Sequence, residues 1–195
     1  MMRIGLTGGI ASGKSSVAAW FRKKGISVFD ADDAVHQIMA ESVMISAIEK
    51  EFGSEYLING EINRPLLALH VFQDQNMKTR LEKLLHPPVL EEMEKQCREA
   101  EKCGEKLIIL DIPLLFEAGW DKFMDEIWVV YVPFSVQLER LILRNGLSGE
   151  EAERRIRSQM NLDEKAGKAD RVIDNGGSRE ETEQQLESIW KDLIL

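Results

Sequence analysis

The chain has 195 residues, of which 44% are hydrophobic and 30% are charged, and its formal net charge is −9. This size and composition are ordinary for one compact α/β domain with inserted substructure, and they are short for two independent domains. The acidic balance argues against broad nucleic-acid binding and against attachment to an anionic membrane face, because both of these partners select basic surfaces.

The sequence carries no pattern of secretion or of membrane insertion. No apolar run approaches the ~20 residues that cross a bilayer, and the N-terminus has no charged segment followed by an apolar one. Cys97 and Cys103 lie in a segment with helical patterning, where their six-residue separation points the two thiols in different directions. We therefore expect free thiols and a cytoplasmic protein.

The first elements in chain order are a buried strand over residues 3–7, a glycine-rich turn, and an amphipathic helix over residues 16–24. The turn, residues 8–15, has the sequence GGIASGKS and fits the phosphate-binding pattern GxxxxGK(S/T). In such a P-loop, successive backbone N–H groups surround the phosphates of a nucleotide, and the helix dipole points its positive end at them. We expect Lys14 to reach the β- and γ-phosphates and the Ser15 hydroxyl to bind Mg²⁺. The predicted nucleotide-binding residues of this segment are Gly8, Gly9, Ile10, Ala11, Ser12, Gly13, Lys14, Ser15 and Ser16.

A short apolar run over residues 26–29 predicts a second strand, and Asp30 and Asp32 follow it directly. We expect this strand to lie beside the P-loop strand, because ligands of open α/β sheets gather at the carboxyl ends of strands. Asp32 is then the leading candidate for the carboxylate that activates or orients a substrate hydroxyl. The alternative is that Asp30 and Asp32 only cap the next helix.

The middle of the chain is predicted to be helical. Asn63 is a predicted helix N-cap with Pro65 in the first turn, and residues 86–88, His-Pro-Pro, are predicted to interrupt the longest helix. Helical patterning covers residues 34–39, 43–52 and 77–102, with a turn-rich loop or small hairpin over residues 53–62. This stretch is too long for a simple crossover between parallel strands, so we interpret residues 33–104 as an inserted helical substrate-binding subdomain.

Three further apolar runs, over residues 107–111, 127–132 and 171–174, predict the rest of the sheet. Strands that alternate with helices imply a central parallel sheet covered on both faces, which is a three-layer fold of the P-loop NTPase type. Asp111 ends the first of these runs, where P-loop proteins place a carboxylate near Mg²⁺, and simple capping of the strand end is the alternative. The predicted core of the single domain comprises residues 1–32, 105–134 and 168–195.

Residues 135–167 are predicted to form a helical lid. Arg140 and Arg144 lie one turn apart on one helix of this segment. Phosphoryl transfer needs more cationic groups than the P-loop lysine, so these arginines are expected to close over the phosphates. The alternative is an ordinary solvated helix face on which Glu139 neutralises either arginine.

A P-loop alone does not distinguish kinases, GTPases and ATP-driven machines. A GTPase needs an NKxD-type segment, and the nearest candidate, GKAD at residues 167–170, lacks the asparagine. Motor ATPases need more chain and more partner surface than this sequence supplies. A small-molecule kinase that uses ATP and Mg²⁺ needs only a P-loop, a carboxylate that positions the acceptor and mobile cationic residues, so it explains the remaining features best.

The sequence resembles the dephospho-coenzyme A kinase family over nearly its whole length. The motifs that carry the resemblance are GLTGGI at residues 5–10, GKS at 13–15, DAD at 30–32, NR at 63–64, LHP at 85–87, PLLFE at 113–117, QL at 137–138 with Arg140 and Arg144, Gln159, and IDN at 173–175. Members of this family transfer the γ-phosphoryl group of ATP to the ribose 3′-hydroxyl of dephospho-coenzyme A, the last step of coenzyme A biosynthesis. The resemblance therefore implies ATP, Mg²⁺ and dephospho-coenzyme A as the ligands of this chain.

The resemblance also implies roles for single residues. Asp32 would activate or position the 3′-hydroxyl, Arg140 would belong to the lid with Arg144, and the Asn175 turn would lie near the adenine. The residues implied to line the coenzyme site are Thr7, Asp32, Arg64, His86, Pro113 and Leu114. The residues implied to act in catalysis are Asp32, Lys14 and Arg140.

Alternatives stay open at several levels. From the residues alone, the favoured interpretation of Arg64 is a surface residue at a helix start. For His86 it is a buried histidine bonded to the backbone at the proline pair. Ala11 departs from the family pattern, which usually has glycine there, and alanine disfavours a positive φ. For the whole chain, the alternatives are another small P-loop nucleoside or nucleotide kinase and a non-catalytic protein that senses nucleotide state.

Overall fold

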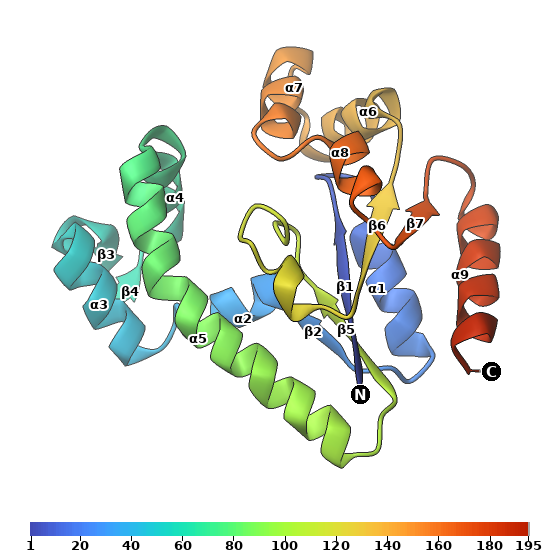
Figure 1. Cartoon of the computed structure of the whole chain (residues 1–195). Helices are drawn as coiled ribbons and strands as arrows, with labels where there is room; N and C mark the ends of the chain where they lie inside the picture. Colours follow the sequence, from blue (N-terminus) through green and yellow to red (C-terminus); the bar gives the residue numbers. More distant parts are fainter. Residues whose placement is uncertain (195) are drawn as a thin grey trace. The chain divides into compact units, whose positions relative to one another are not determined.

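The computed structural model describes residues 1–194 and contains a five-stranded sheet with the strand order β2-β5-β1-β6-β7 (Figure 1). The central strand β1 (Met2–Gly8) pairs in parallel with β5 (Leu107–Asp111) and with β6 (Glu126–Tyr131). β6 also pairs in parallel with β7 (Arg171–Asp174), and β2 (Val28–Asp30) lies at the edge beside β5. The predicted α/β fold with a central parallel sheet is confirmed.

The chain divides into two compact units. The sheet unit comprises Met1–Phe29 and Ala100–Leu195, and the helical unit comprises Asp30–Glu99. The helices of the sheet unit are α1 (Lys14–Lys23), η2 (Asp121–Phe123), α6 (Phe134–Asn145), α7 (Gly149–Arg157), α8 (Leu162–Gly167) and α9 (Arg179–Ile194).

Cys97 and Cys103 are free thiols, as the sequence predicts. No helix among residues 1–194 is long and apolar enough to cross a membrane.

Alternate residues of β6 point to opposite faces of the sheet and pack against different helices. Trp128 and Val130 belong to a core cluster that includes side chains of α1 and Leu186 of α9. Val129 packs instead with Leu162 of α8. Because successive strand residues alternate between faces, these two clusters lie on opposite sides of the sheet. The sheet is therefore the middle of three layers, as its buried apolar strands predict.

The two helices that follow β6 pack against each other and against the P-loop. Leu141 of α6 and Ala152 and Ile156 of α7 form one buried cluster. Ile10 and Ala11 of the glycine-rich turn are packed against this cluster. The segment that begins at α6 therefore forms part of the support of the P-loop within the sheet unit.

The helical unit consists of helices and one short hairpin. The side chain of Asn63 accepts a hydrogen bond from the N–H of Leu66 (3.3 Å), so the predicted N-cap is confirmed. The short strands β3 and β4 pair antiparallel in the segment predicted as a loop or hairpin. The elements of this unit are α2 (Ala31–Ile38), α3 (Ser42–Phe52), η1 (Ser54–Tyr56), β3 (Leu57–Ile58), β4 (Glu61–Ile62), α4 (Arg64–Gln73) and most of α5 (Gln75–Lys102).

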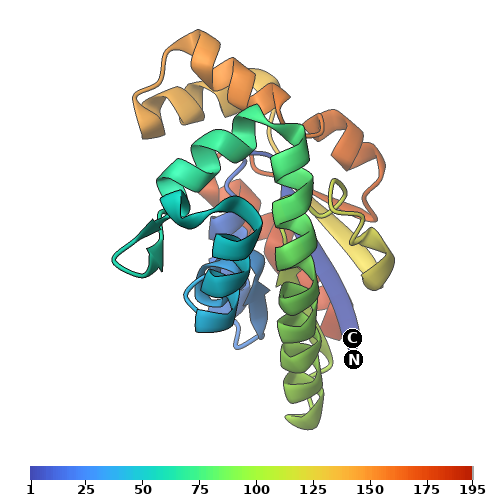
Figure 2. The same ribbon diagram turned by 90° about the vertical axis from the view of Figure 1, so that its left-hand side faces the viewer.

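The helix α5 runs unbroken through Pro87 and Pro88, so the predicted interruption at these residues is wrong (Figure 2). A proline inside a helix removes a backbone donor and clashes with the preceding turn, at a cost of ~3 kcal/mol or more. A buried stripe with a spacing of four residues crosses the proline pair and consists of Leu85, Val89, Met93 and Cys97. Burial of each large aliphatic side chain contributes ~1.5–3 kcal/mol, which offsets the cost of the prolines. Tertiary packing therefore decides the continuity of this helix.

Candidate active site

The glycine-rich turn joins β1 to α1, as the P-loop pattern predicts. β1 ends at Gly8, and α1 begins at Lys14 with Gly13 as its N-cap residue. Within the turn, the N–H of Ser12 donates to the carbonyl of Gly9 (3.1 Å). The positive end of the α1 dipole therefore points into the turn and favours a bound phosphate group.

Two residues of the P-loop have left-handed backbone conformations. Gly13 has a φ of 88° and Ala11 has a φ of 61°. At Gly13, an added Cβ would lie 2.1 Å from the Nδ2 of Asn175, so both the turn and its neighbour require glycine. For an L-residue such as Ala11, the left-handed conformation costs roughly 1–2 kcal/mol. Ala11, at the position where the family that the sequence resembles usually has glycine, therefore has a strained backbone conformation.

Side chains from the C-terminal third of the chain hold the P-loop by its backbone. The carbonyl of Ile10 accepts a hydrogen bond from Nε2 of Gln137 (2.8 Å), and its N–H donates to Oε1 of Gln159 (2.9 Å). The carbonyl of Ser12 accepts from Nδ2 of Asn175 (2.7 Å). These contacts orient the peptide groups of the loop, which is the preorganisation that an electrostatic phosphate site requires.

Asn175 is bonded through both ends of its side-chain amide. While Nδ2 donates to the loop, Oδ1 accepts a hydrogen bond from the hydroxyl of Thr182 in α9 (2.9 Å). The turn after β7 is thus tied both to the P-loop and to the terminal helix. The side chain of Asn175 therefore positions the P-loop.

A cavity of about 890 Å³ lies beside the P-loop within the sheet unit. Its lining includes Ala11 of the loop, Arg140 of α6 and Asn175. Arg140 is half-buried there. Arg144 is exposed, and its Nε donates to the side chain of Asn145 (2.9 Å). Of the two predicted lid arginines, Arg140 is therefore the one that the structure brings to the loop.

The ammonium group of Lys14 pairs with the carboxylate of Asp111 at the end of β5. Asp111 is 2% exposed and stands opposite Leu6 in the pairing of β5 with β1.

The expectation that the strand ending at Asp30 lies beside the P-loop strand is wrong, because β5 lies between β2 and β1. Crossover connections do not require neighbouring strands to be consecutive in the chain. The carboxylate at the C-terminal end of β5, which neighbours β1, is therefore Asp111.

The remaining predicted residues of the sheet unit differ in exposure. Thr7 is fully buried, and its hydroxyl donates to the carbonyl of Pro113 (3.0 Å). Leu114 is 38% exposed. Ser15 and Ser16, in the first turn of α1, are exposed. The structure thus joins Thr7 to the segment after β5 and leaves the Ser15 hydroxyl accessible at the helix start.

In the helical unit, Asp30 caps α2. Its Oδ1 accepts hydrogen bonds from the N–H groups of Asp32 (3.0 Å) and Asp33 (3.2 Å). The capping alternative therefore holds for Asp30. Asp32 is exposed in the first turn of the same helix.

The two other substrate residues predicted for the helical unit lie on α4 and α5. Arg64 begins α4, and its Nη2 donates to the carbonyl of His36 in α2 (2.8 Å), while Nη1 contacts the imidazole Nδ1 of the same histidine. His86 is half-buried on α5. Arg64 therefore links α4 to the helix that carries Asp32.

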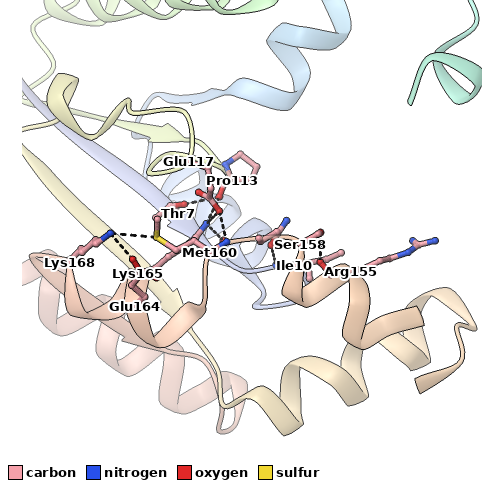
Figure 3. A network of polar contacts seen from close by, with 12 residues as sticks. Thr7, Ile10, Pro113, Glu117, Arg155, Ser158, Met160, Glu164, Lys165 and Lys168 are labelled. Atoms are coloured by element: carbon pink, nitrogen blue, oxygen red, sulfur yellow. Dashed lines mark hydrogen bonds and ion pairs between the residues drawn. The ribbon is translucent and has the colours of Figure 1, made fainter. Parts of the chain in front are cut away.

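Lys165 of α8 is fully buried and was not among the predicted site residues. Its Nζ donates to the carbonyls of Pro113 (3.0 Å) and Gly8 (3.3 Å) and pairs with Oε1 of Glu117 (2.9 Å; Figure 3). Burial lowers the pKa of Lys165, and the neighbouring Glu117 opposes that shift. The available clue was helical spacing, since Lys165 follows the buried Leu162 by three residues and so shares its face of α8.

Comparison with protein families and curated proteins gives one family. The dephospho-CoA kinase family model matches residues 2–181. The dephospho-CoA kinase of Symbiobacterium thermophilum is 46% identical over 193 residues, which cover 98% of this chain and 81% of that protein. The dephospho-CoA kinase of Bacillus licheniformis is 45% identical over 195 residues, which cover 97% of each chain.

Solved structures agree with this result. The dephospho-CoA kinase from Campylobacter jejuni has a TM-score of 0.74 and 27% identity, and the match covers 98% of this chain and 96% of that one. A shikimate kinase from Aquifex aeolicus, with a TM-score of 0.52, 22% identity and 99% coverage of both chains, shares the fold. The family model and the curated relatives span nearly the whole sequence, P-loop included. The chain therefore belongs to the dephospho-CoA kinase family.

Proposed function

We propose that this chain transfers the γ-phosphoryl group of ATP to the ribose 3′-hydroxyl of dephospho-coenzyme A, giving coenzyme A and ADP, the last step of coenzyme A biosynthesis. The name shared by the relatives supports the acceptor and disfavours another nucleotide kinase or a nucleotide sensor. The observation that supports ATP as the phosphoryl donor is the P-loop. Lys14 lies at the start of α1, and Arg140 lines the adjoining cavity.

The triphosphate would bind over the backbone of residues 8–16. Lys14 would move from Asp111 to the β- and γ-phosphates, whose negative charge competes with that of the carboxylate. Arg140, as part of a lid over residues 135–167, would stabilise the charge that develops on the transferred group. The turn at Asn175 and the lining of the cavity would hold the nucleoside, and Arg144 would add positive charge at the lid.

The donor atoms beside the P-loop fit Mg²⁺. This ion prefers hard oxygen ligands, and the exposed Ser15 hydroxyl and the Asp111 carboxylate are of that kind. When bound, Mg²⁺ would neutralise negative charge on the phosphates. Ser15 would ligate the ion directly and Asp111 would act through water.

Asp32 and five further residues are proposed to bind the acceptor. Asp32 is proposed to orient the 3′-hydroxyl, and the assignment of the α2 cap to Asp30 supports a separate role for Asp32. A loose transition state needs little help from a base, so alignment of the hydroxyl is the larger part of this role. The residues proposed to line the coenzyme site are Thr7, Arg64, His86, Pro113 and Leu114.

The same proposal covers domain organisation and partners. The chain acts as a single kinase domain, in which residues 33–104 form the substrate-binding insertion between parts of the core. ATP and dephospho-coenzyme A are its partners. A net charge of −9 supports the absence of nucleic-acid and membrane partners. The free thiols of Cys97 and Cys103 support a cytoplasmic location.

A coupled assay of ADP release against a panel of acceptors tests this function. Dephospho-coenzyme A should stimulate ADP release strongly, whereas AMP, nucleosides and shikimate should stimulate it little. Equal turnover with AMP would move the chain to the nucleotide kinases. Nucleotide binding without stimulation by any acceptor would instead support a sensor.

A further inference from the structure

Lys165 is the one lysine or arginine that is buried among residues 1–194. Removal of an ammonium group from water is costly, and an apolar side chain of similar volume is often as stable at a buried site. Packing of α8 against the sheet therefore does not by itself explain a lysine at this position. The contacts of its ammonium group indicate what the charge does.

The ammonium group has three N–H donors, and each has an acceptor within the sheet unit (Figure 3). The acceptors are the carbonyl of Gly8 at the start of the P-loop (3.3 Å), the carbonyl of Pro113 after β5 (3.0 Å) and Oε1 of Glu117 (2.9 Å). The side chain thus links α8 to two segments that are far from it in the chain.

Two of these acceptors are shared with other donors. Oε1 of Glu117 also accepts from the N–H of Met160 (3.0 Å), between α7 and α8, and the carbonyl of Pro113 also accepts from the hydroxyl of Thr7 (3.0 Å). Figure 3 shows these groups converging on Lys165. The network therefore joins the end of β1, the segment after β5 and the segment before α8.

The contact with Gly8 acts on the phosphate-binding loop directly. Because a peptide group is planar, a hydrogen bond that fixes the Gly8 carbonyl also fixes the N–H of the next residue. The ammonium group also places a positive charge beside the loop, where burial limits screening by water and salt. Repulsion from the ammonium group of Lys14 contributes to the lowered pKa of Lys165, so the two charges interact. A polyanion on the loop would experience the same field as an attraction.

We propose that Lys165 is a positioning residue for the nucleotide, which fixes the start of the P-loop through the Gly8 carbonyl and adds a buried positive charge that favours the triphosphate. This inference rests on the proposed use of the P-loop for ATP. The effect assigned to Lys165 is on the affinity for ATP, which is measured in the absence of the acceptor.

The central test is the double variant Lys165→Met with Glu117→Gln. Methionine removes the charge and the donors at similar length. The glutamine amide oxygen still accepts from Met160 and leaves no unpaired carboxylate beside the methionine. We expect the Kd for ATP, measured without acceptor, to rise about tenfold or more. Lys165→Arg retains the charge and should recover most of the ATP affinity. Lys168→Met, an exposed lysine on the C-terminal side of the same helix, is the matched control and should bind ATP like the wild type.

ATP binding is measured by calorimetry without acceptor, so its outcome does not depend on dephospho-coenzyme A being the substrate. A wild type that binds ATP but ignores dephospho-coenzyme A would contradict the proposed function and leave this test intact. A folded double variant with wild-type ATP affinity, or an equal loss in Lys168→Met, would overturn the role of Lys165. If the double variant does not fold, Lys165→Arg decides, since a tenfold loss of ATP affinity with the charge retained would contradict the proposal.

Discussion

The ammonium group of Lys14 lies against the carboxylate of Asp111, which joins the first residue of α1 to the end of the neighbouring strand β5. The pair holds the P-loop lysine beside the position of the phosphates and keeps a buried carboxylate beside it. This arrangement makes Asp111 a testable part of the phosphate and metal site.

Asp111→Asn should lower turnover by about 10–100-fold, because it removes a carboxylate that would act on Mg²⁺ through water and on Lys14 directly. The amide keeps a similar shape, so the fold should survive. The measurement is kcat as a function of Mg²⁺ concentration, and the variant should need more Mg²⁺ for half-maximal activity. Asp121→Asn, at an exposed aspartate of η2, is the control. A wild-type Mg²⁺ dependence in Asp111→Asn would assign this carboxylate to strand-end capping alone.

Ala11→Gly should stabilise the chain, since Ala11 has a φ of 61°. Relief of the left-handed conformation should raise the free energy of unfolding by about 1 kcal/mol, even though glycine makes the unfolded chain more flexible. Urea denaturation measures this change. Ala19→Gly, at a helical position in α1, should destabilise the chain by about 1 kcal/mol. The account of Ala11 fails if both substitutions shift stability in the same direction.

Asp32→Asn should leave ATP binding intact and reduce turnover by about 10²–10⁴-fold. The neutral amide cannot take up the proton of the acceptor hydroxyl, and it orients that hydroxyl less strongly than a carboxylate does. Steady-state kinetics and ATP calorimetry on the same preparation separate the two effects. Asp33→Asn, the next residue of α2 and also exposed, is the matched control. Turnover close to wild type in Asp32→Asn would contradict the role proposed for Asp32.

The stability of the fold should rise with pH on the alkaline side because of Lys165. Burial lowers the pKa of this lysine from its ordinary value of 10.5. Between the lowered pKa and 10.5, the unfolded chain binds a proton that the folded chain has released, so the free energy of unfolding increases with pH. The wild type should therefore gain stability relative to Lys165→Met as the pH rises on the alkaline side towards 10.5. A stability difference that is constant over this range would show that the burial of Lys165 has no effect on its titration.

Local features were predictable because their residues are contiguous. The P-loop pattern lies within residues 8–15, and the cap at Asn63 depends on the first turn of one helix. The apolar runs of residues 107–111 and 171–174 form the strands β5 and β7 with the same bounds. In each case the sequence pattern that identifies the feature spans only a few residues.

Features that depend on distant contacts were not predictable. The position of β5 between β1 and β2 results from the packing of crossovers, and the sequence of β2 does not indicate its neighbour. The continuity of α5 through Pro87 and Pro88 depends on the burial of residues on both sides of them. Lys165 has three acceptors from two remote segments, and only its helical spacing from Leu162 indicated burial.

The most direct measurement is the identity of the phosphorylated product. The chain should be incubated with ATP, Mg²⁺ and dephospho-coenzyme A, and the products analysed by phosphorus NMR and mass spectrometry. One phosphomonoester on the ribose 3′-oxygen for each ADP formed is the predicted result. ADP without a phosphorylated acceptor, or a phosphate on another hydroxyl, would contradict the account.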